Sequence, residues 1–282
     1  MAKKRSEHRE RKAPGPRKAG VLAMFPDEVE AKLGRGEDIA ILTIGSVEQH
    51  GPALLLGCDG FGVQGFAAKV AEHSGGTLFP IIPFSWTGGT DYFSGAVSVR
   101  SLKFVHYLKA VVRSLWRTGF RRILLMNAHG GNFYTMRAVT RDLLKDDGIP
   151  VLCTYAVPHF PELEKIRGAG GEGSGMCGGL KVLGREDLVA AVKKYDQAAT
   201  EEFGDIQVGH EPESFRRARP LGVVGHDYWH ECLHVRPGVP IDEVRAVELF
   251  EVAGKKMAEL LELYGQYVDD FLTAREAGAE PW

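Results

Sequence analysis

The sequence has no long hydrophobic run, few cysteines and almost no net charge, and each absence excludes a class of protein. No apolar stretch approaches the roughly 20 residues that a helix needs to cross a bilayer, so we expect no membrane partner. The four cysteines show no CxxC spacing and we expect no signal peptide, which together are typical of reduced cytosolic thiols. A net charge of -2 over 282 residues gives no sign of a nucleic-acid partner. We therefore expect a soluble, cytoplasmic protein.

The sequence also lacks the Walker-type phosphate loop and the GxGxxG dinucleotide fingerprint. Residues 1–20 are rich in lysine and arginine and nearly free of apolar side chains. We interpret them as a solvated, disordered tail rather than a nucleic-acid arm or a targeting peptide. No internal repeat or linker divides the remainder, so residues 21–282 are expected to form a single domain.

Strand-like and helix-like patterns alternate along the first half of the chain, which is typical of βαβ units in an α/β fold with a mostly parallel sheet. We expect strands at 39–44, 79–84, 121–126 and 151–155, and helices at 60–72, 101–118, 132–145, 186–195 and 241–264. Ser101 and Asn132 are expected to cap their helices. Residues 167–179 contain seven glycines, a density that predicts a loop.

Two short motifs follow buried strands at glycine-rich turns. They are EQHGP at 48–52, with an aspartate at 59, and NAHGGN at 127–132. Ligands of open α/β sheets bind at the carboxyl ends of the strands, so we expect Glu48, His50, Asp59 and His129 to converge there. Carboxylates with imidazoles are the ligand set of Zn²⁺ and, with more oxygen, of Mn²⁺.

Two of the candidate ligands have competing interpretations. Asp59 lies near the start of a helix and could cap it, but its position after the first motif favours a carboxylate that bridges two cations. Glu172 is the one carboxylate in the segment GAGGEGS at 168–174. We interpret it as a fifth ligand rather than a helix-capping side chain on a flexible loop.

With this spacing, the two motifs resemble those of the creatininase (creatinine amidohydrolase) family, and the resemblance extends from about residue 21 to the last helix. It implies a three-layer α/β/α sandwich, two divalent ions, Zn or Mn, and usually a homohexamer. By this resemblance Glu48 and His129 would bind one ion, His50 and a glutamate would bind the other, and Asp59 would bridge them.

The chain departs from the family pattern at two points. Creatininase takes its last glutamate ligand two residues after the histidine of the second motif, where this chain has Gly131. Other members carry a His-Ala-Gly-Glu-x-Glu-Thr-Ser segment, which aligns Glu172 with a ligand and places Arg167 where the family has a catalytic histidine. We therefore expect Arg167 to bind substrate or stabilise charge, and His159, His210 or the group His226, His230 and His234 to supply any acid.

The resulting hypothesis is a binuclear hydrolase in which a hydroxide held between the ions attacks a carbonyl of a small cyclic metabolite. The bond cleaved would be a cyclic amide C–N bond. Creatinine itself is not the expected substrate, because the tryptophans that cover creatinine in the true creatininases have no match near Arg167. The alternatives are ring-opening C–C hydrolysis of an inositol-derived cyclic diketone, of the 3-dehydro-scyllo-inosose type, and a non-catalytic metabolite-binding protein. The candidate catalytic residues are Arg167, His129 and Glu172.

Two further features have open roles. Trp86 in the segment 86–92 is expected either to line the pocket or to pack under its own loop. His226, His230 and His234 would share one face of a helix, and we interpret them as a substrate wall or subunit interface rather than a third metal site.

Overall fold

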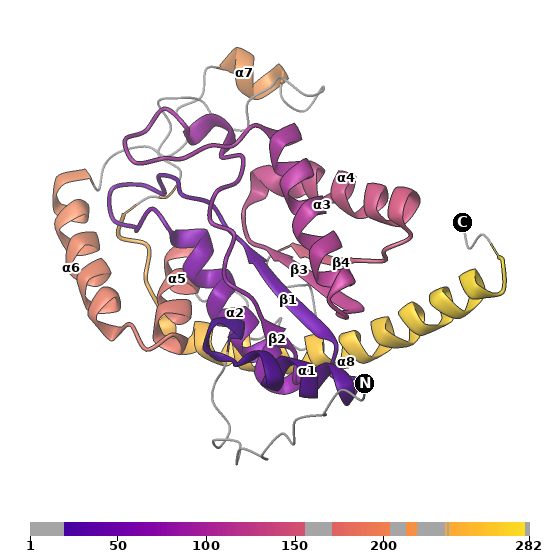
Figure 1. The fold of residues 1–282 in the computed structure, drawn as a ribbon. Coiled ribbons are helices and arrows are strands. Elements are labelled where there is room, and N and C mark those ends of the chain that lie inside the picture. The colour runs from indigo at the N-terminus through magenta and orange to yellow at the C-terminus, as the bar shows by residue number, and fades with distance from the viewer. Residues whose placement is uncertain (1–19, 156–170, 204–212, 219–234, 236, 280–282) are drawn as a thin grey trace, which may run out of the picture.

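This computed structural model describes residues 20–155, 171–203, 213–218, 235 and 237–279 (Figure 1). Several residues singled out in the sequence lie outside this described part. They are Arg167, His159, His210, His226, His230 and His234, together with residues 1–19 of the expected tail.

Four strands form a parallel sheet in the spatial order β2-β1-β3-β4. They are β1 (Ile39–Ile44), β2 (Thr77–Leu78), β3 (Arg122–Asn127) and β4 (Leu152–Tyr155). The register of the central pair runs from Ile39 opposite Arg122 to Ile44 opposite Asn127. Because both central strands end at the same level, the segments that follow them leave the sheet side by side.

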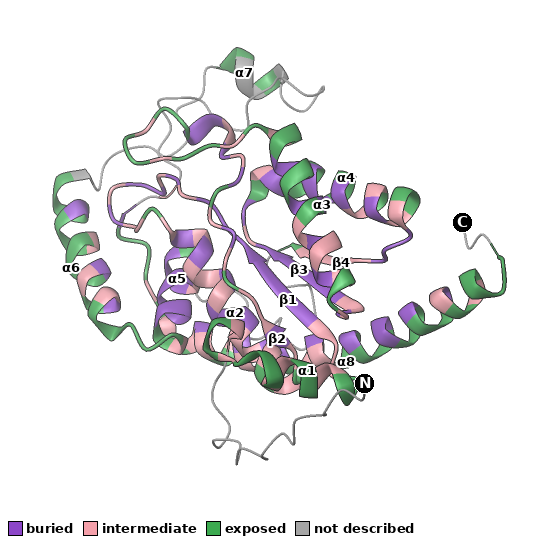
Figure 2. Ribbon diagram, in the orientation of Figure 1, coloured by how far each residue is buried: buried purple, intermediate pink, exposed green. Residues whose placement is uncertain are grey.

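The central strands are buried on both faces, as their continuous apolar sequences predict (Figure 2). Successive side chains alternate between two hydrophobic cores. One core contains Ala40, Leu42, Ile44, Ile123 and Leu125, and the other contains Ile41, Leu124 and Met126. The sheet is therefore the middle layer of three.

The helices cover both faces of the sheet. They are α1 (Pro26–Gly34), α2 (Cys58–Ser74), α3 (Ser101–Arg117), α4 (Phe133–Asp142), α5 (Gly171–Val182), α6 (Glu186–Phe203), α7 (Glu213–Ala218) and α8 (Glu243–Glu276). Short turns of helix lie at η1 (Val21–Ala23), η2 (Gly88–Thr90), η3 (Gly130–Asn132) and η4 (Leu143–Asp147). Helices α3 and α4, with α1, pack on one face, while α2 and α8 pack on the other. The expected three-layer α/β/α sandwich is confirmed.

Three local predictions were wrong. The segment 79–84 contains two prolines and forms only an isolated bridge from Ile82 to Ile44, while the short strand β2 lies just before it. Asn132 occupies the N-cap position of α4, but its side chain makes no capping hydrogen bond, and its amide group donates to the side-chain carbonyl of Asn127 at 3.0 Å. Ser101 is the first residue of α3 rather than its cap.

The glycine-rich segment expected to be a loop is, from residue 171 onward, the helix α5. Its glycines allow close contact between helices rather than a flexible backbone. A Cβ on Gly179 would collide with the backbone carbonyl of Phe61 in α2, and a Cβ on Gly178 would lie 2.6 Å from that of Ala246 in α8. Glycine lets the three helix backbones approach closely, which composition alone cannot distinguish from a loop.

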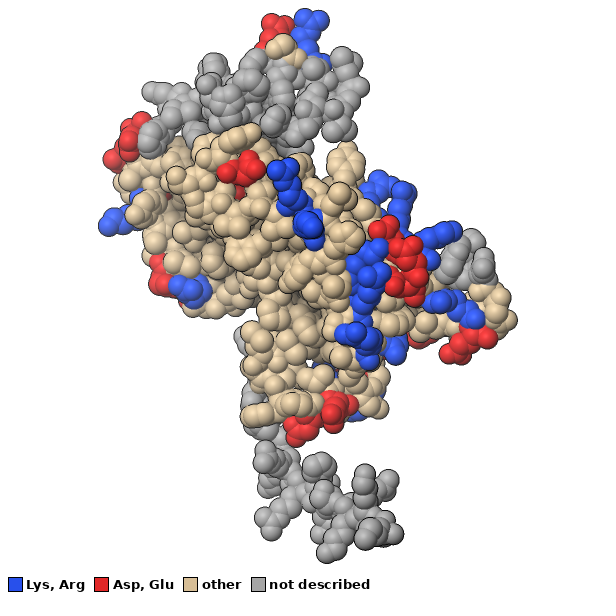
Figure 3. Space-filling view, turned by 45° about the horizontal axis from the view of Figure 1, so that its top comes forward, with Lys and Arg blue, Asp and Glu red and all other residues tan. Residues whose placement is uncertain are grey.

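None of the helices in the described part of the chain is long and apolar enough to span a membrane. On the face shown in Figure 3, lysines and arginines lie beside aspartates and glutamates. The charges on this face are therefore mixed rather than of one sign.

Candidate metal centre

The two sequence motifs meet because β1 and β3 are neighbours that end in register. The segment after β1 is fixed by backbone bonds, including the Glu48 N–H donating to the Leu56 carbonyl at 3.0 Å. Gly51 follows His50 with a φ of 87°, and a side chain there would collide with the carbonyl of Val235, so glycine is required at this turn. The chain then returns through α2, whose first turn carries Asp59.

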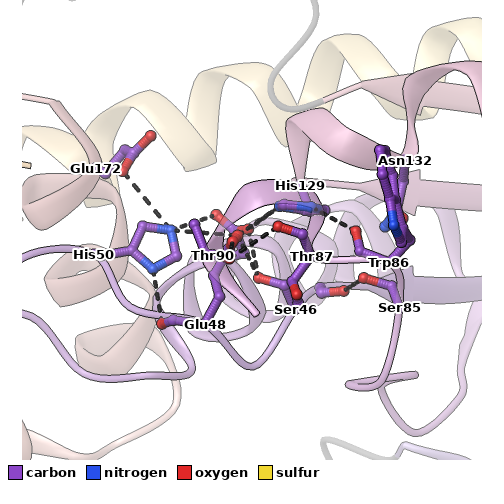
Figure 4. A network of polar contacts seen from close by, with 12 residues as sticks. Ser46, Glu48, His50, Ser85, Trp86, Thr87, Thr90, His129, Asn132 and Glu172 are labelled. Carbon is purple, nitrogen blue, oxygen red and sulfur yellow. Dashed lines mark hydrogen bonds and ion pairs between the residues drawn. The ribbon is translucent and has the colours of Figure 1, made fainter. Parts of the chain in front are cut away.

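His129 is held between a backbone carbonyl and two carboxylates (Figure 4). Its Nε2 lies 2.8 Å from the carbonyl oxygen of Trp86, which can only accept, so Nε2 carries a hydrogen. Its Nδ1 lies 2.6 Å from Oε1 of Glu48 and 3.1 Å from Oδ2 of Asp59. In the neutral ring this leaves the lone pair of Nδ1 directed at the two carboxylates.

His50 has the same arrangement with its nitrogens exchanged. Its Nδ1 lies 3.2 Å from the backbone carbonyl oxygen of Glu48, which makes Nδ1 the donor. Its Nε2 lies 3.4 Å from Oδ1 of Asp59 and 3.8 Å from Oε2 of Glu172. The two histidines therefore face opposite oxygens of Asp59.

Two hydroxyls that the sequence reasoning missed support the carboxylates of Glu48 and Asp59. The Ser46 hydroxyl lies 3.0 Å from Oε1 of Glu48 and 2.8 Å from Oδ2 of Asp59. The Thr90 hydroxyl contacts Oε2 of Glu48 and lies 2.9 Å from the carbonyl of Thr87. Ser46 could have been found, because it stands two residues before Glu48 in an extended segment and faces the same side. Thr90 arrives from a distant turn, for which the sequence gives no comparable signal.

Glu172 reaches the cluster from the first turn of α5 rather than from a loop. The close packing of α5 on α2 at glycines brings this helix to the edge of the site. Position 131 has no room for a comparable side chain, because a Cβ there would lie 2.5 Å from Nε2 of His129. The carboxylate that faces His50 therefore comes from α5.

The segment around Trp86 lines the cluster through its backbone and through Thr90. Tyr155, at the end of β4, is a further residue that the sequence reasoning did not select. Its hydroxyl lies 3.0 Å from the position of a Cβ on Gly130, next to His129. Burial and the charges of the three carboxylates raise the pKa of Tyr155, so its hydroxyl stays protonated near neutral pH.

The electrostatics of the cluster favour bound cations. Burial lowers the pKa of His129, but hydrogen bonds and charges from Asp59 and Glu48 outweigh it and raise the pKa to about 10. Burial likewise opposes the effect of Asp59, Glu48 and Glu172 on His50, and the result is a pKa of about 9. Burial raises the pKa of Asp59, but its bonds to both histidines hold it well below the ordinary range. Within the described residues, no lysine or arginine forms an ion pair with Glu48 or Asp59.

A small cavity of about 20 Å³ opens beside His50 and Glu172, which is room for about one water molecule. Its other walls include the apolar side chains of Leu54, Val239 and Ile241.

Comparisons with known proteins agree with the fold. The family model for creatininase, described as creatinine amidohydrolase, matches residues 23–227. The 3-dehydro-scyllo-inosose hydrolase of Thermotoga maritima is 38% identical over 100 residues, which are 34% of this chain and 31% of that protein. The creatinine amidohydrolase of Pseudomonas putida is 29% identical over 110 residues, which are 37% of this chain and 42% of that protein. The matched segments thus span less than half of either relative.

Solved structures extend the likeness to the whole fold. A crystal structure of creatinine amidohydrolase superposes with a TM-score of 0.65 at 20% identity, covering 86% of this chain and 96% of that one. A manganese creatininase and a Zn–Zn form of a creatininase mutant each give a TM-score of 0.64 at 19% identity, covering 86% of this chain and 97% of theirs. Since the family model matches most of the chain, the protein belongs to the creatininase family, a family of hydrolases.

Proposed function

We propose that this chain is a hydrolase that uses two divalent ions, Zn or Mn, to cleave a small cyclic metabolite at a carbonyl. The observation that carries the proposal is the placement of Asp59, which presents one oxygen to each histidine. Each histidine in turn fixes its other ring nitrogen on a backbone carbonyl, the arrangement that orients metal-binding imidazoles in proteins.

The donor atoms fit two cations rather than one. Glu48, Asp59 and His129 form one group of candidate ligands whose atoms lie within 4.8 Å of one another. Nε2 of His50 lies 3.4 Å from Asp59 and 3.8 Å from Glu172, so these three residues could hold the second ion, with Asp59 common to both. When bound, a pair of divalent ions supplies an activated water and polarises a carbonyl oxygen. The solved manganese and Zn–Zn creatininases support this choice of ions.

The chain's own residues would hold and orient this centre. Ser46 and Thr90 fix the oxygens of Glu48, while the carbonyl of Trp86 fixes the ring of His129. Tyr155 can donate a hydrogen bond to a substrate at this end of the sheet. We retain Arg167 as a proposed substrate-binding or charge-stabilising residue, because guanidinium is always protonated and its fork suits an oxyanion.

The bond cleaved has two candidates. Hydrolysis of a cyclic amide corresponds to the family's description. Ring opening of a cyclic diketone is favoured by the 38% identity to a 3-dehydro-scyllo-inosose hydrolase. A 1,3-diketone would expel a stabilised enolate, which relaxes the need for a strong acid at the position of Arg167.

Turnover assays on a cyclic amide and on a cyclic 1,3-diketone test the proposal. We expect one substrate to be cleaved, the activity to vanish after chelation, and the activity to return when Zn or Mn is added. Asp59→Asn should abolish activity, whereas the charge-matched exposed control Glu201→Gln should not. Undiminished turnover by the folded, metal-free protein would refute the proposal, and ligand binding without turnover would favour the non-catalytic alternative.

We also propose that residues 21–282 form one catalytic domain and that the protein is a cytoplasmic homohexamer. Exposed apolar side chains on α8, such as Leu263 and Tyr267, are consistent with self-association. Light scattering on purified protein measures the state of assembly.

A further inference from the structure

Cys58 lies immediately before the central carboxylate of the site, at the start of α2. Its Sγ, a ring nitrogen of His50 and a carboxylate oxygen of Glu172 all lie within 4.8 Å of one another. This group is distinct from the group formed by Glu48, Asp59 and His129. The thiol is therefore placed among the donors of the second ion and not those of the first.

A buried free cysteine usually acts as a small apolar side chain, and Cys58 does belong to one hydrophobic cluster with Met176 and Leu180. Cys177 provides the comparison, because it belongs to the same hydrophobic cluster and is equally buried. Cys177 joins no group of candidate ligands within the described residues, whereas Cys58 does. Packing alone thus accounts for Cys177, whereas the Cys58 thiol also donates a long hydrogen bond to the backbone carbonyl of Glu172 at 3.8 Å, which directs its sulfur at the turn of α5 that carries the Glu172 carboxylate.

The distances suit a thiolate ligand. Around a tetrahedral ion with a Zn–S distance near 2.3 Å and Zn–N and Zn–O distances near 2.1 Å, donor atoms are roughly 3.5 Å apart. The separations in this group are at most 4.8 Å, so a contraction of at most about 1.3 Å brings the thiol into coordination. Side-chain rotation of Glu172, which is 43% exposed, can supply much of that contraction.

We propose that Cys58 is a fourth protein ligand of the ion held by His50, Asp59 and Glu172. This inference rests on the proposed function above, since it requires that ion to bind. On coordination the S–H bond of Cys58 would break, its proton would pass to solvent, and a sulfur–metal bond would form with no change of oxidation state. Because thiolate is a soft donor and Mn²⁺ prefers oxygen, Cys58 makes the second position selective for Zn²⁺.

The two ion positions then differ in kind. The position at Glu48, Asp59 and His129 has three protein ligands, the number typical of catalytic sites that keep a place for water or substrate. The second position has four, the number typical of tightly held ions. Substrate would therefore meet the first position, and the second would anchor the pair.

Cobalt substitution of the full-length protein tests this assignment. A cobalt–thiolate bond gives an intense near-ultraviolet charge-transfer absorption that oxygen and nitrogen ligands do not produce. We expect this absorption in the wild-type protein and in Cys177→Ser, and its loss in both Cys58→Ser and Cys58→Ala. We also expect Cys58→Ser to weaken Zn²⁺ binding at least roughly tenfold, the lower end of the loss caused by removing a supporting partner, with Mn²⁺ binding unchanged.

The outcomes separate the two proposals. If cobalt binds with its visible bands but without the charge-transfer absorption, the metal centre stands and the role of Cys58 is wrong. Persistence of the absorption in Cys58→Ser would equally overturn the role of Cys58. If the folded protein binds no cobalt at all, the proposed function fails and the role of Cys58 fails with it.

Discussion

At the scale of single residues, Glu48 is a buried carboxylate and Asp59 a largely buried one, and their partners in the described part of the chain include two histidines and one serine. In the metal-free protein the histidines hold protons where we propose that ions bind. The pKa is raised to about 9 for His50 and to about 10 for His129, so in the absence of metal a proton on each histidine supplies the positive charge that a bound ion would supply. Metal loading should therefore displace protons from the site.

This substitution predicts a pH dependence that differs between the loaded and the metal-free protein. A histidine whose folded pKa lies above its ordinary value of 6.5 stabilises the fold fully below that value, and the contribution is lost as pH rises through 9 to 10. We expect the Tm of chelated protein to fall over this range, and that of zinc-loaded protein to fall less. Thermal unfolding at a series of pH values measures both.

Replacing His129 with glutamine provides the control for other groups that titrate in alkali. Its chelated form should lose less stability over the same range. A chelated wild-type protein whose Tm is flat or rises from pH 6.5 to about 10 would contradict the proton-for-metal account.

Ser46 supports the centre without being a candidate ligand. Because its hydroxyl contacts both Glu48 and Asp59, Ser46→Ala should weaken metal binding by roughly tenfold. Ser85 is an equally buried serine whose hydroxyl donates to the backbone carbonyl of Gly45 at 2.8 Å. Ser85→Ala should cost about 1 kcal/mol of stability and leave metal affinity unchanged. Metal titrations and denaturant unfolding of both variants decide whether Ser46 acts on the centre or only on the fold.

At the scale of elements, the strands next to the site were predictable and the helix beside it was not. The apolar runs of β1 and β3 predicted their bounds to within a residue, because burial on both faces leaves a continuous signal. Helix α8 was predicted as the longest but extends twelve residues beyond the expected end, to Glu276. The glycines of α5 led to the prediction of a loop. They are needed because α5 packs closely against α2 and α8, and this packing could not be foreseen because those helices are distant in sequence.

The contact between α5 and α2 makes a prediction of its own. A Cβ on Gly179 would overlap the backbone of Phe61, so Gly179→Ala should destabilise the fold by about 1–3 kcal/mol. Gly175 lies in the same helix with nothing within 4 Å of its Cβ position. Gly175→Ala should therefore be neutral or stabilise by about 0.5–1 kcal/mol.

Denaturant unfolding of the two glycine variants, with metal present and after chelation, measures the difference. Because α5 carries Glu172, Gly179→Ala should also lower metal affinity, while Gly175→Ala should not. Equal effects of the two substitutions would show that the helices do not meet at Gly179.

At the scale of the whole molecule, the site exists because three layers place distant segments at one edge of the sheet. Sequence reasoning predicted that the segments after β1 and β3 would meet there, since carboxyl ends of parallel strands share an edge. It could not predict the turn that delivers Thr90 or the carbonyl of Trp86, because both depend on the path of a loop through space. The role of Arg167 stays a prediction.

The central claim is that Asp59 joins two ions, and metal content per chain tests it most directly. Protein purified without chelator should contain about two divalent ions per chain, as expected for a two-metal centre. The two carboxylate oxygens of Asp59 face different histidines, so Asp59→Asn should lose nearly both ions. Of these two histidines, Glu172 faces His50, so Glu172→Gln should lose about one ion. Folded wild-type protein that contains no metal, or equal metal content in the two variants, would contradict the account.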